Sequence, residues 1–207
     1  MAVNLDQGYT GVIIDAARAV GILRNQLAYM LATAQWETAQ TMLPVREAYW
    51  LSEDWREANL NYYPWYGRGF VQLTWEENYQ RADNELHLKG ALAADAELAL
   101  EPTIAGMVMI IGMSQGWFTG KKLSDYIDLE HSDFINARRI INGTDCATDI
   151  AEIAADFDAA LLVEGYGVDD WEPQPAPVPS PLRSYEEQVA RLDALEAWAI
   201  TQGYVRG

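Results

Sequence analysis

The amino-acid sequence predicts a mainly α-helical protein, and three observations lead to that fold class. Apolar residues recur at intervals of three and four across residues 12–42, the pattern of helices with one buried face. The pattern returns in five later segments, which are residues 75–86, 104–117, 123–127, 133–141 and 148–162. A strand-like segment is limited to residues 69–73. With 207 residues, the chain is long enough for one domain and a small appendage.

Glycine and proline divide the helical pattern. Gly21 separates a first helix from a second. Pro44 lacks an amide donor and its ring clashes with the preceding turn, so the second helix is expected to end near Met42. Residues 45–67 show no sustained period, which indicates a long loop of the kind that often lines a site. The apolar run at residues 104–113 is far shorter than the roughly 20 residues that span a bilayer, and it predicts a buried helix.

Composition excludes several classes of function. Fourteen lysines and arginines against thirty-one acidic residues give a formal net charge of −17, which repels nucleic acid and anionic membranes. The single cysteine, Cys146, cannot form an intramolecular disulfide, and His87 and His131 lack the spacing of a metal site. We expect neither a cofactor nor a metal ion, so the chemistry should rest on carboxylates. The N-terminus lacks the basic and apolar segments of a secretion signal.

Two glutamates have positions suited to acid and base catalysis. Glu37 borders the buried stripe of the second helix, and a carboxyl group held against apolar surface favours its neutral form. Beyond the proline, Glu47 begins the loop next to Arg46, whose charge would help to keep it ionised. A protonated carboxyl group facing an ionised one is the minimal equipment for hydrolysis of a glycosidic bond.

Aromatic residues are concentrated in the same part of the sequence. Residues 49–79 contain ten of the twenty-three aromatic residues, and sugar rings stack on such side chains. Two glycines in residues 65–74 allow the backbone to turn tightly around an arginine. The side chains of this motif that offer aromatic faces, charge or hydrogen bonds are Trp65, Tyr66, Arg68, Gln72 and Thr74, followed by Asn78. The motif predicts a turn that leads into a polar groove with aromatic walls.

These residues resemble the family 19 glycoside hydrolases, a lysozyme-like group that includes plant chitinases and many phage endolysins. The resemblance runs from residue 26 to residue 162 and rests on four motifs in order. They are QWETA at 35–39 for the family's His-Glu-Thr/Ser-Gly, WYGRGFVQLT at 65–74 for its Tyr-x-Gly-Arg-Gly-x-x-Gln-Leu-Thr, DAELA at 95–99 near its Asp-Pro-Glu-Leu-Ala, and ARRIING at 137–143 for its Arg-Arg-Ile-Asn-Gly. Trp36 and Ala39 replace the family's histidine and glycine beside the acid, and Asp145 matches its later acidic residue only loosely.

The resemblance implies a lysozyme-like α-helical domain with a substrate cleft and an inverting mechanism. Glu37 would protonate the leaving oxygen, and Glu47 would deprotonate a water molecule that Thr74 helps to hold. Glu53 is the rival of Glu47 for the role of base. The residues that would bind substrate are Gln72, Asn78 and Asn142, together with Arg68, Tyr66 and Trp65 of the turn. Arg68 would either support the loop or pair with a catalytic carboxylate.

The short interval between Glu37 and Glu47 resembles that of phage enzymes more than that of plant chitinases. We therefore expect an endolysin that cleaves the glycan strands of peptidoglycan. A chitinase of the same family, and an inactive carbohydrate-binding or virion structural protein, are the alternatives. Such an enzyme would stay in the host cytoplasm until its release to the cell wall, or would be associated with the virion. Neither nucleic acid nor stable membrane insertion is expected.

The predicted domain organisation has three parts. The catalytic domain covers residues 1–170. Residues 171–181 form a linker, because prolines at alternate positions favour an extended spacer. Residues 182–207 form an amphipathic helix, whose apolar stripe is expected to dock on the domain or to pair with a second copy. An element that attaches to the wall or the virion, and a helix on a membrane surface, are the alternatives.

Overall fold

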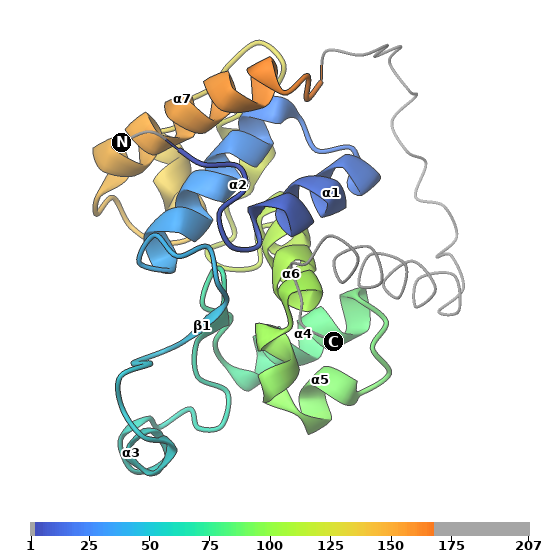
Figure 1. The fold of residues 1–207 in the computed structure, drawn as a ribbon. Coiled ribbons are helices and arrows are strands. Elements are labelled where there is room, and N and C mark those ends of the chain that lie inside the picture. Colours follow the sequence, from blue (N-terminus) through green and yellow to red (C-terminus); the bar gives the residue numbers. More distant parts are fainter. Residues whose placement is uncertain (1–2, 168–207) are drawn as a thin grey trace.

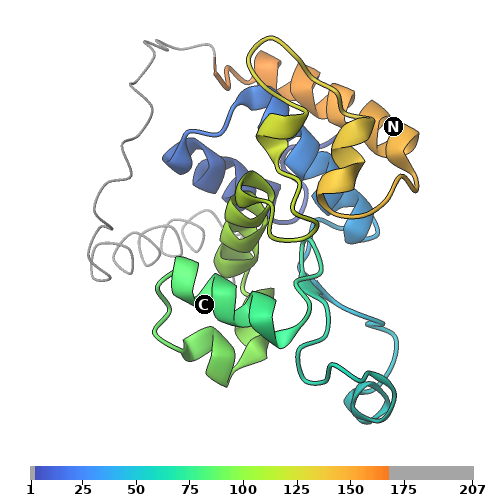
Figure 2. The ribbon, with the colours of Figure 1, turned by 180° about the vertical axis from the view of Figure 1, so that it is seen from behind.

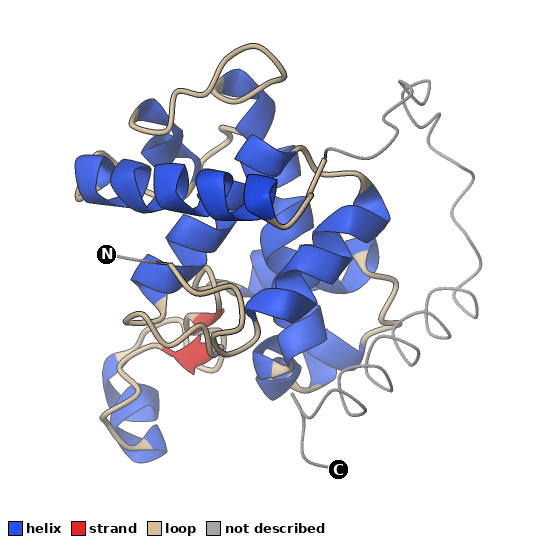
Figure 3. Cartoon of the chain, turned by 45° about the horizontal axis from the view of Figure 1, so that its top comes forward, coloured by secondary structure: helices blue, strands red, loops and turns tan. Residues whose placement is uncertain are grey.

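The computed structural model describes residues 3–167, and this part of the chain is mainly helical, with one short two-stranded sheet (Figure 3). The predicted linker at 171–181 and helix at 182–207 lie outside the described residues. The elements in chain order are α1 (Thr10–Val20), α2 (Arg24–Glu37), β1 (Val45–Arg46), α3 (Glu53–Asn59), β2 (Arg68–Gly69), α4 (Glu76–Glu85), α5 (Ala91–Ala94), the 3-10 helix η1 (Ala96–Leu100), α6 (Pro102–Gln115), the 3-10 helices η2 (Leu123–Asp125) and η3 (Asn136–Ile140), and α7 (Ala147–Val163).

Helix α6 lies in the middle of the described part of the molecule (Figure 1). Helices α1, α2 and α7 lie on one side of it, and α4, α5 and the segment from β1 through α3 lie on the other, as the view from behind also shows (Figure 2). Helix α2 packs along α7, and α1 packs against α6. Fully buried side chains join these elements into one core, among them Leu27, Leu31, Met109 and Phe157.

Helix α2 is buried from residue 27 to residue 35. It ends at Glu37, earlier than the predicted end near Met42. The hydroxyl of Thr38 donates to the carbonyl oxygen of Ala34 at 2.8 Å and accepts the N–H of Met42 at 3.0 Å. This side chain offers the backbone a partner outside the helical pattern, so the chain turns before it reaches the proline.

The N-terminal segment packs on the turn that follows α2. The N–H of Tyr9 donates to the carbonyl oxygen of Met42 at 3.0 Å. Gly8 has a φ of +51°, and a Cβ atom there would lie 2.6 Å from the carbonyl oxygens of both Thr41 and Met42. A side chain would therefore push this contact apart, and glycine allows the N-terminal segment to hold the turn.

A two-stranded antiparallel sheet joins the two ends of the predicted loop at residues 45–67. Its register pairs Val45 with Gly69 and Arg46 with Arg68. The predicted strand at residues 69–73 is reduced to β2 and one isolated bridge between Arg68 and Leu73. The sheet places both ends of the intervening segment at one point of the fold.

The predicted loop also contains a helix, so that prediction was wrong in part. Ser52 caps α3, and its hydroxyl accepts the N–H of Trp55 at 3.2 Å. Glu53 and Asp54 occupy the first turn, where the helix dipole favours negative charge, and Arg56 lies in the last turn. These local signals stabilise a helix too short to show a period.

The remaining predictions hold for the longer helices. Helices α4, α6 and α7 correspond to the predicted segments at 75–86, 104–117 and 148–162, and Gly21 ends α1 with a φ of 75°. The segments at 123–127 and 133–141 form the 3-10 helices η2 and η3 rather than α-helices, while α5 and η1 were not predicted. Among the described residues, no helix combines the length and the apolar character needed to cross a membrane.

Candidate active site

Glu37 is the last residue of α2, and an arginine of η3 holds its carboxylate. Nη1 of Arg138 donates to Oε1 of Glu37 at 2.8 Å. The side chain of Glu37 is 21% exposed, whereas that of Arg138 is 5% exposed. The carboxyl group of Glu37 is thus paired with a cation, whereas the sequence predicted only apolar surroundings for it. About a fifth of the side chain remains exposed to solvent.

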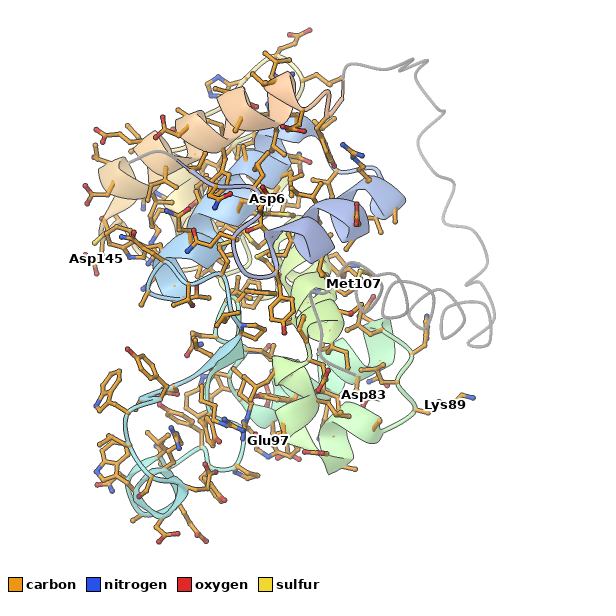
Figure 4. All side chains as sticks on the ribbon, in the orientation of Figure 1. Asp6, Asp83, Lys89, Glu97, Met107 and Asp145 are labelled. Carbon is orange, nitrogen blue, oxygen red and sulfur yellow. The ribbon has the colours of Figure 1, made fainter. Side chains whose placement is uncertain are left out.

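Arg138 also fixes the segment that follows it. Its Nε donates to the carbonyl oxygen of Asp145 at 3.1 Å, and the N–H of Asn142 donates to the carbonyl oxygen of Arg138 at 3.0 Å. Asp145 lies on the same side of the molecule as the end of α2 (Figure 4). The side chain of Asn142 is exposed and accepts the N–H of Gly143 at 2.8 Å. The backbone of Asn142 and the carbonyl of Asp145 are therefore both hydrogen-bonded to the arginine that pairs with Glu37.

Glu47 follows β1, and four hydrogen bonds fix it, one of them from Nε of Arg56 to its carbonyl oxygen at 2.9 Å. The hydroxyl of Tyr62 donates to Oε1 at 2.7 Å, and the N–H of Gly67 donates to Oε2 at 3.0 Å. The N–H of Glu47 in turn donates to the carbonyl oxygen of Gly67 at 2.7 Å. Burial, together with the adjacent Glu47 carboxylate, raises the pKa of Tyr62 to about 12, so the hydroxyl keeps its proton. Each oxygen of the Glu47 carboxylate therefore has one donor.

Arg46 does not have the role that its position next to Glu47 predicted. Its guanidinium forms an ion pair with Glu97 of η1. No ion pair between Arg46 and Glu47 is found in residues 3–167. The two uncharged donors, Tyr62 and Gly67, take the place of the predicted cation.

The polar residues predicted at the turn form one hydrogen-bonded unit with β1. Nε2 of Gln72 donates to the carbonyl oxygen of Val45 at 3.1 Å. The hydroxyl of Thr74 donates to the carbonyl oxygen of Gln72, and Nδ2 of Asn78 donates to that of Thr74, each at 2.8 Å. A Cβ atom at Gly67 would lie 2.7 Å from Oε1 of Gln72, so the glycine allows this close approach. These contacts join the predicted base and its polar neighbours in one turn.

The predicted site residues thus form two groups. Glu37 and Asn142 gather around Arg138, while Glu47 gathers with the polar residues of the turn. The end of α2 lies next to β1 in both ribbon views (Figures 1 and 2). The elements that carry Glu37 and Glu47 are also consecutive in the chain, since α2 ends at Glu37 and β1 begins at Val45.

Glu53, the rival for the role of base, lies in the first turn of α3. Its Oε2 accepts from Nη1 of Arg56 at 3.1 Å, and the hydroxyl of Tyr66 lies 3.0 Å and 3.1 Å from its two oxygens. The side chain of Glu53 is 49% exposed. Its charge is thus balanced by an arginine, whereas the charge of Glu47 meets uncharged donors.

Arg68 and Tyr66 hold the turn from its interior. Arg68 is 3% exposed and donates from Nη1 to the carbonyl oxygens of Pro64 and Tyr66 at 2.8 Å and 3.2 Å. Its guanidinium carbon lies 3.5 Å from the centre of the Tyr66 ring. Of the two roles predicted for Arg68, the contacts show support of the loop. Tyr66 is fully buried and offers no surface to a sugar in this structure, while Trp65 is half-buried against Tyr79.

Sequence reasoning assigned no role to Glu97, which organises this interior. Glu97 accepts hydrogen bonds from Arg46, Arg68 and Tyr66. Burial alone would raise the pKa of Glu97, but the hydrogen bonds from Arg46 and Arg68 hold it below its ordinary value. The DAELA motif at 95–99 was the available signal for this residue. The partner role of Tyr62 has no comparable signal, since it arises from the fold of the segment.

Exposed aromatic side chains surround the turn. Those with the largest exposed fractions are Tyr49 at 62%, Trp50 at 71%, Trp55 at 38% and Trp75 at 53%. Tyr49 and Trp50 pack edge to face with ring centres 5.1 Å apart, and Trp75 packs on Tyr62 at 4.8 Å. Trp75 is linked to Glu47 through Tyr62, and exposed rings of this kind are suited to stack on a ligand with flat apolar faces.

Within residues 3–167, no three histidine, cysteine or acidic side chains are grouped so that they could hold a metal ion. The chain was also compared with known proteins. No protein-family model matches it, no curated protein matches it, and no solved structure matches it. Function must therefore be inferred from the site itself.

Proposed function

We propose that the protein is a glycoside hydrolase with a lysozyme-like cleft, which cleaves the β-1,4 bonds of peptidoglycan glycan strands with inversion. Glu37 is the general acid and Glu47 the general base. The observation that carries this proposal is the contrast between the two carboxylates. Glu37 is paired with the guanidinium of Arg138 and its side chain stays 21% exposed, whereas Glu47 accepts from two uncharged donors, Tyr62 and Gly67.

The proposed reaction uses the two groups in turn. Glu37 transfers its proton to the glycosidic oxygen as the bond from that oxygen to the anomeric carbon breaks. Glu47 removes a proton from a water molecule whose oxygen attacks the anomeric carbon from the opposite face. Afterwards Glu37 is ionised and Glu47 protonated, and exchange with solvent restores both.

Arg138 has a specific part in this scheme. Its guanidinium stabilises the charge that appears on Glu37 as the proton leaves, which lowers the energy of the transition state. Arg138 therefore acts on the product side of the proton transfer, after the proton has left Glu37.

Peptidoglycan is favoured over chitin by the resemblance to phage enzymes in the interval between Glu37 and Glu47. On this proposal the enzyme waits in the host cytoplasm, or on the virion, before it reaches the wall. A second candidate function is a catalytically inactive carbohydrate-binding protein. The exposed rings of Tyr49, Trp50 and Trp75 support it, because they would bind a sugar without any chemistry.

Product analysis separates these functions. The purified protein is incubated with peptidoglycan and with chitin oligomers, the products are identified by mass spectrometry, and their anomers are followed by proton NMR. We expect new reducing ends that form first as α-anomers. Glu37→Gln and Glu47→Gln should each abolish cleavage, and Glu53→Gln is the matched control that should retain it. Binding of glycans with no cleavage would support the second candidate, and full activity of Glu37→Gln would refute the hydrolase.

A further inference from the structure

A cavity of about 820 Å³ lies beside the turn that carries Glu47, bounded by β1, α3, β2 and η1. This volume is within the range of pockets that bind small molecules, roughly 300–1,000 Å³. Neither Glu37 nor Glu47 lines it, so the cavity adjoins the proposed catalytic groups without containing them. It is therefore placed to bind a part of the substrate that does not react.

The cavity contains an unusual share of the positive charge. Its lining includes Arg46, Arg56 and Arg68, three of the fourteen lysines and arginines in a chain of net charge −17. The acidic residues of the lining are Glu53, Asp95 and Glu97, so the cavity is formally neutral. An anion that approaches this wall meets far less repulsion than the overall charge would suggest.

The acidic side chains of the cavity are occupied by internal donors. Glu97 accepts from Arg46, Arg68 and Tyr66, and Glu53 accepts from Arg56 and Tyr66. Figure 4 places Glu97 between the α3 segment and α5, and its side chain is 42% exposed. The carboxylates thus serve to hold the arginines in position.

Arg46 is the cation that a ligand can reach. Its side chain is 45% exposed, whereas those of Arg56 and Arg68 are 4% and 3% exposed. The buried Arg56 and Arg68 contribute positive potential to the cavity. The planar guanidinium of Arg46 has several N–H donors, and some of them can bind a carboxylate at the cavity opening. Tyr49, which is 62% exposed, lines the same cavity as Arg46 and offers it an aromatic ring.

We infer that this cavity binds a carboxylate carried by a sugar of the glycan strand, with Arg46 as the pairing cation and Tyr49 beneath the sugar. The inference rests on the proposed function for the identity of the ligand as a glycan. Chitin carries no carboxylate, whereas peptidoglycan carries them on the lactyl group of its muramic acid or on the attached peptide. The cavity therefore selects peptidoglycan over chitin.

Binding is measured on Glu37→Gln, so that cleavage cannot interfere, by NMR titration with three ligands. They are di-N-acetylchitobiose, the disaccharide of N-acetylglucosamine and N-acetylmuramic acid, and the same disaccharide bearing a dipeptide. We expect a carboxylate-bearing ligand to bind about fivefold more tightly than chitobiose at low salt, the factor typical of a part-exposed ion pair. The preference should shrink at high salt. Preference for the plain acidic disaccharide assigns the lactyl carboxylate, and preference for the dipeptide form alone assigns the peptide.

Three variants in the same background test the role of Arg46. Arg46→Gln should remove the preference and Arg46→Lys should restore part of it. Arg24→Gln is the matched control, because Arg24 is 30% exposed and paired with Asp158 away from this cavity, and it should keep the preference. Equal affinity for all three ligands, or a preference that survives Arg46→Gln, would overturn the inference. Because binding is read without turnover, these outcomes are independent of whether the protein hydrolyses glycans.

Discussion

Arg138 joins Glu37 across 101 residues of sequence, through a hydrogen-bonded ion pair of 2.8 Å. The contact ties the end of α2 to η3, and the same guanidinium reaches the carbonyl of Asp145. One side chain thus positions the proposed acid and the segment that faces it. The following predictions test this relationship and those around Glu47.

Arg138→Gln should destabilise the fold and slow catalysis. Removing one partner of a largely buried ion pair leaves the other uncompensated, and we expect the free energy of unfolding to fall by about 1–3 kcal/mol. In a double-mutant cycle with Glu37→Gln, the two effects should not add, because both variants remove the same contact. Denaturant unfolding of the parent, the two single variants and the double variant measures the loss in free energy of unfolding and the coupling between the two side chains. Arg139→Gln, which changes the exposed neighbour, should change stability by less than about 0.5 kcal/mol, and additive effects in the cycle would contradict the prediction.

Tyr62→Phe should lower kcat about tenfold while KM changes little. The substitution keeps the ring that packs on Trp75 and removes only the hydroxyl that fixes Oε1 of Glu47. Without this hydroxyl the base is held less firmly, and the activation free energy should rise by roughly 1.5 kcal/mol, the contribution of one hydrogen bond to a charged group. Steady-state kinetics on a soluble glycan provide the measurement. Tyr126→Phe is the control, and an unchanged kcat in Tyr62→Phe would show that this hydroxyl does not position the base.

Gly67→Ala should disturb the turn that carries the proposed base. The new Cβ atom would lie 2.7 Å from Oε1 of Gln72 and 3.3 Å from its Cβ, so the side chain must shift and the bond from Gln72 to Val45 weakens. We expect a loss of about 1–2 kcal/mol in stability together with reduced activity. Gly143→Ala is the matched control, because a Cβ atom there meets nothing within 4 Å. Equal melting temperatures for the two variants would argue against the packing described for this turn.

Glu97 should make stability depend on pH in the acidic range. Its pKa in the folded protein is held below the ordinary value of 4.5, mainly by Arg46 and Arg68 against the effect of burial. A carboxylate of this kind contributes stability above its unfolded pKa, and that contribution is lost as the pH falls through the folded pKa. The difference in melting temperature between the parent and Glu97→Gln should thus be largest above about pH 4.5. It should decrease toward zero as the pH falls below that value. Glu152→Gln, at an exposed position of α7, should show no such change, and a constant difference across pH would refute the assignment.

Much of the helical framework follows from local sequence. Repeats of apolar residues predicted α2, α6 and α7, and Gly21 marked the break between α1 and α2, because each of these signals acts over a few residues. The end of α2 was missed because the side chain of Thr38 competes for backbone partners before Pro44 can act. Helix α3 was missed because its stability comes from a cap and charges at its ends rather than from a stripe.

The candidate site could be predicted less completely. The positions of Glu37 and Glu47 follow from their elements, but their partners come from distant segments. The ion pair from Arg138 and the hydroxyl of Tyr62 are set by tertiary packing, which no spacing in the sequence reveals. Arg46 was assigned to the wrong glutamate, because its partner Glu97 lies 51 residues further along the chain and is brought to it by the fold.

The contact between the N-terminal segment and the turn after α2 has a practical consequence for protein engineering. The N–H of Tyr9 and the backbone of Gly8 lie against the carbonyls of Thr41 and Met42, only a few residues beyond Glu37. Shortened versions of the protein that start after Tyr9 would lose this backbone contact with Thr41 and Met42. We expect them to have lower activity, although both glutamates remain. Affinity tags are therefore better joined ahead of an intact N-terminus than used to replace it.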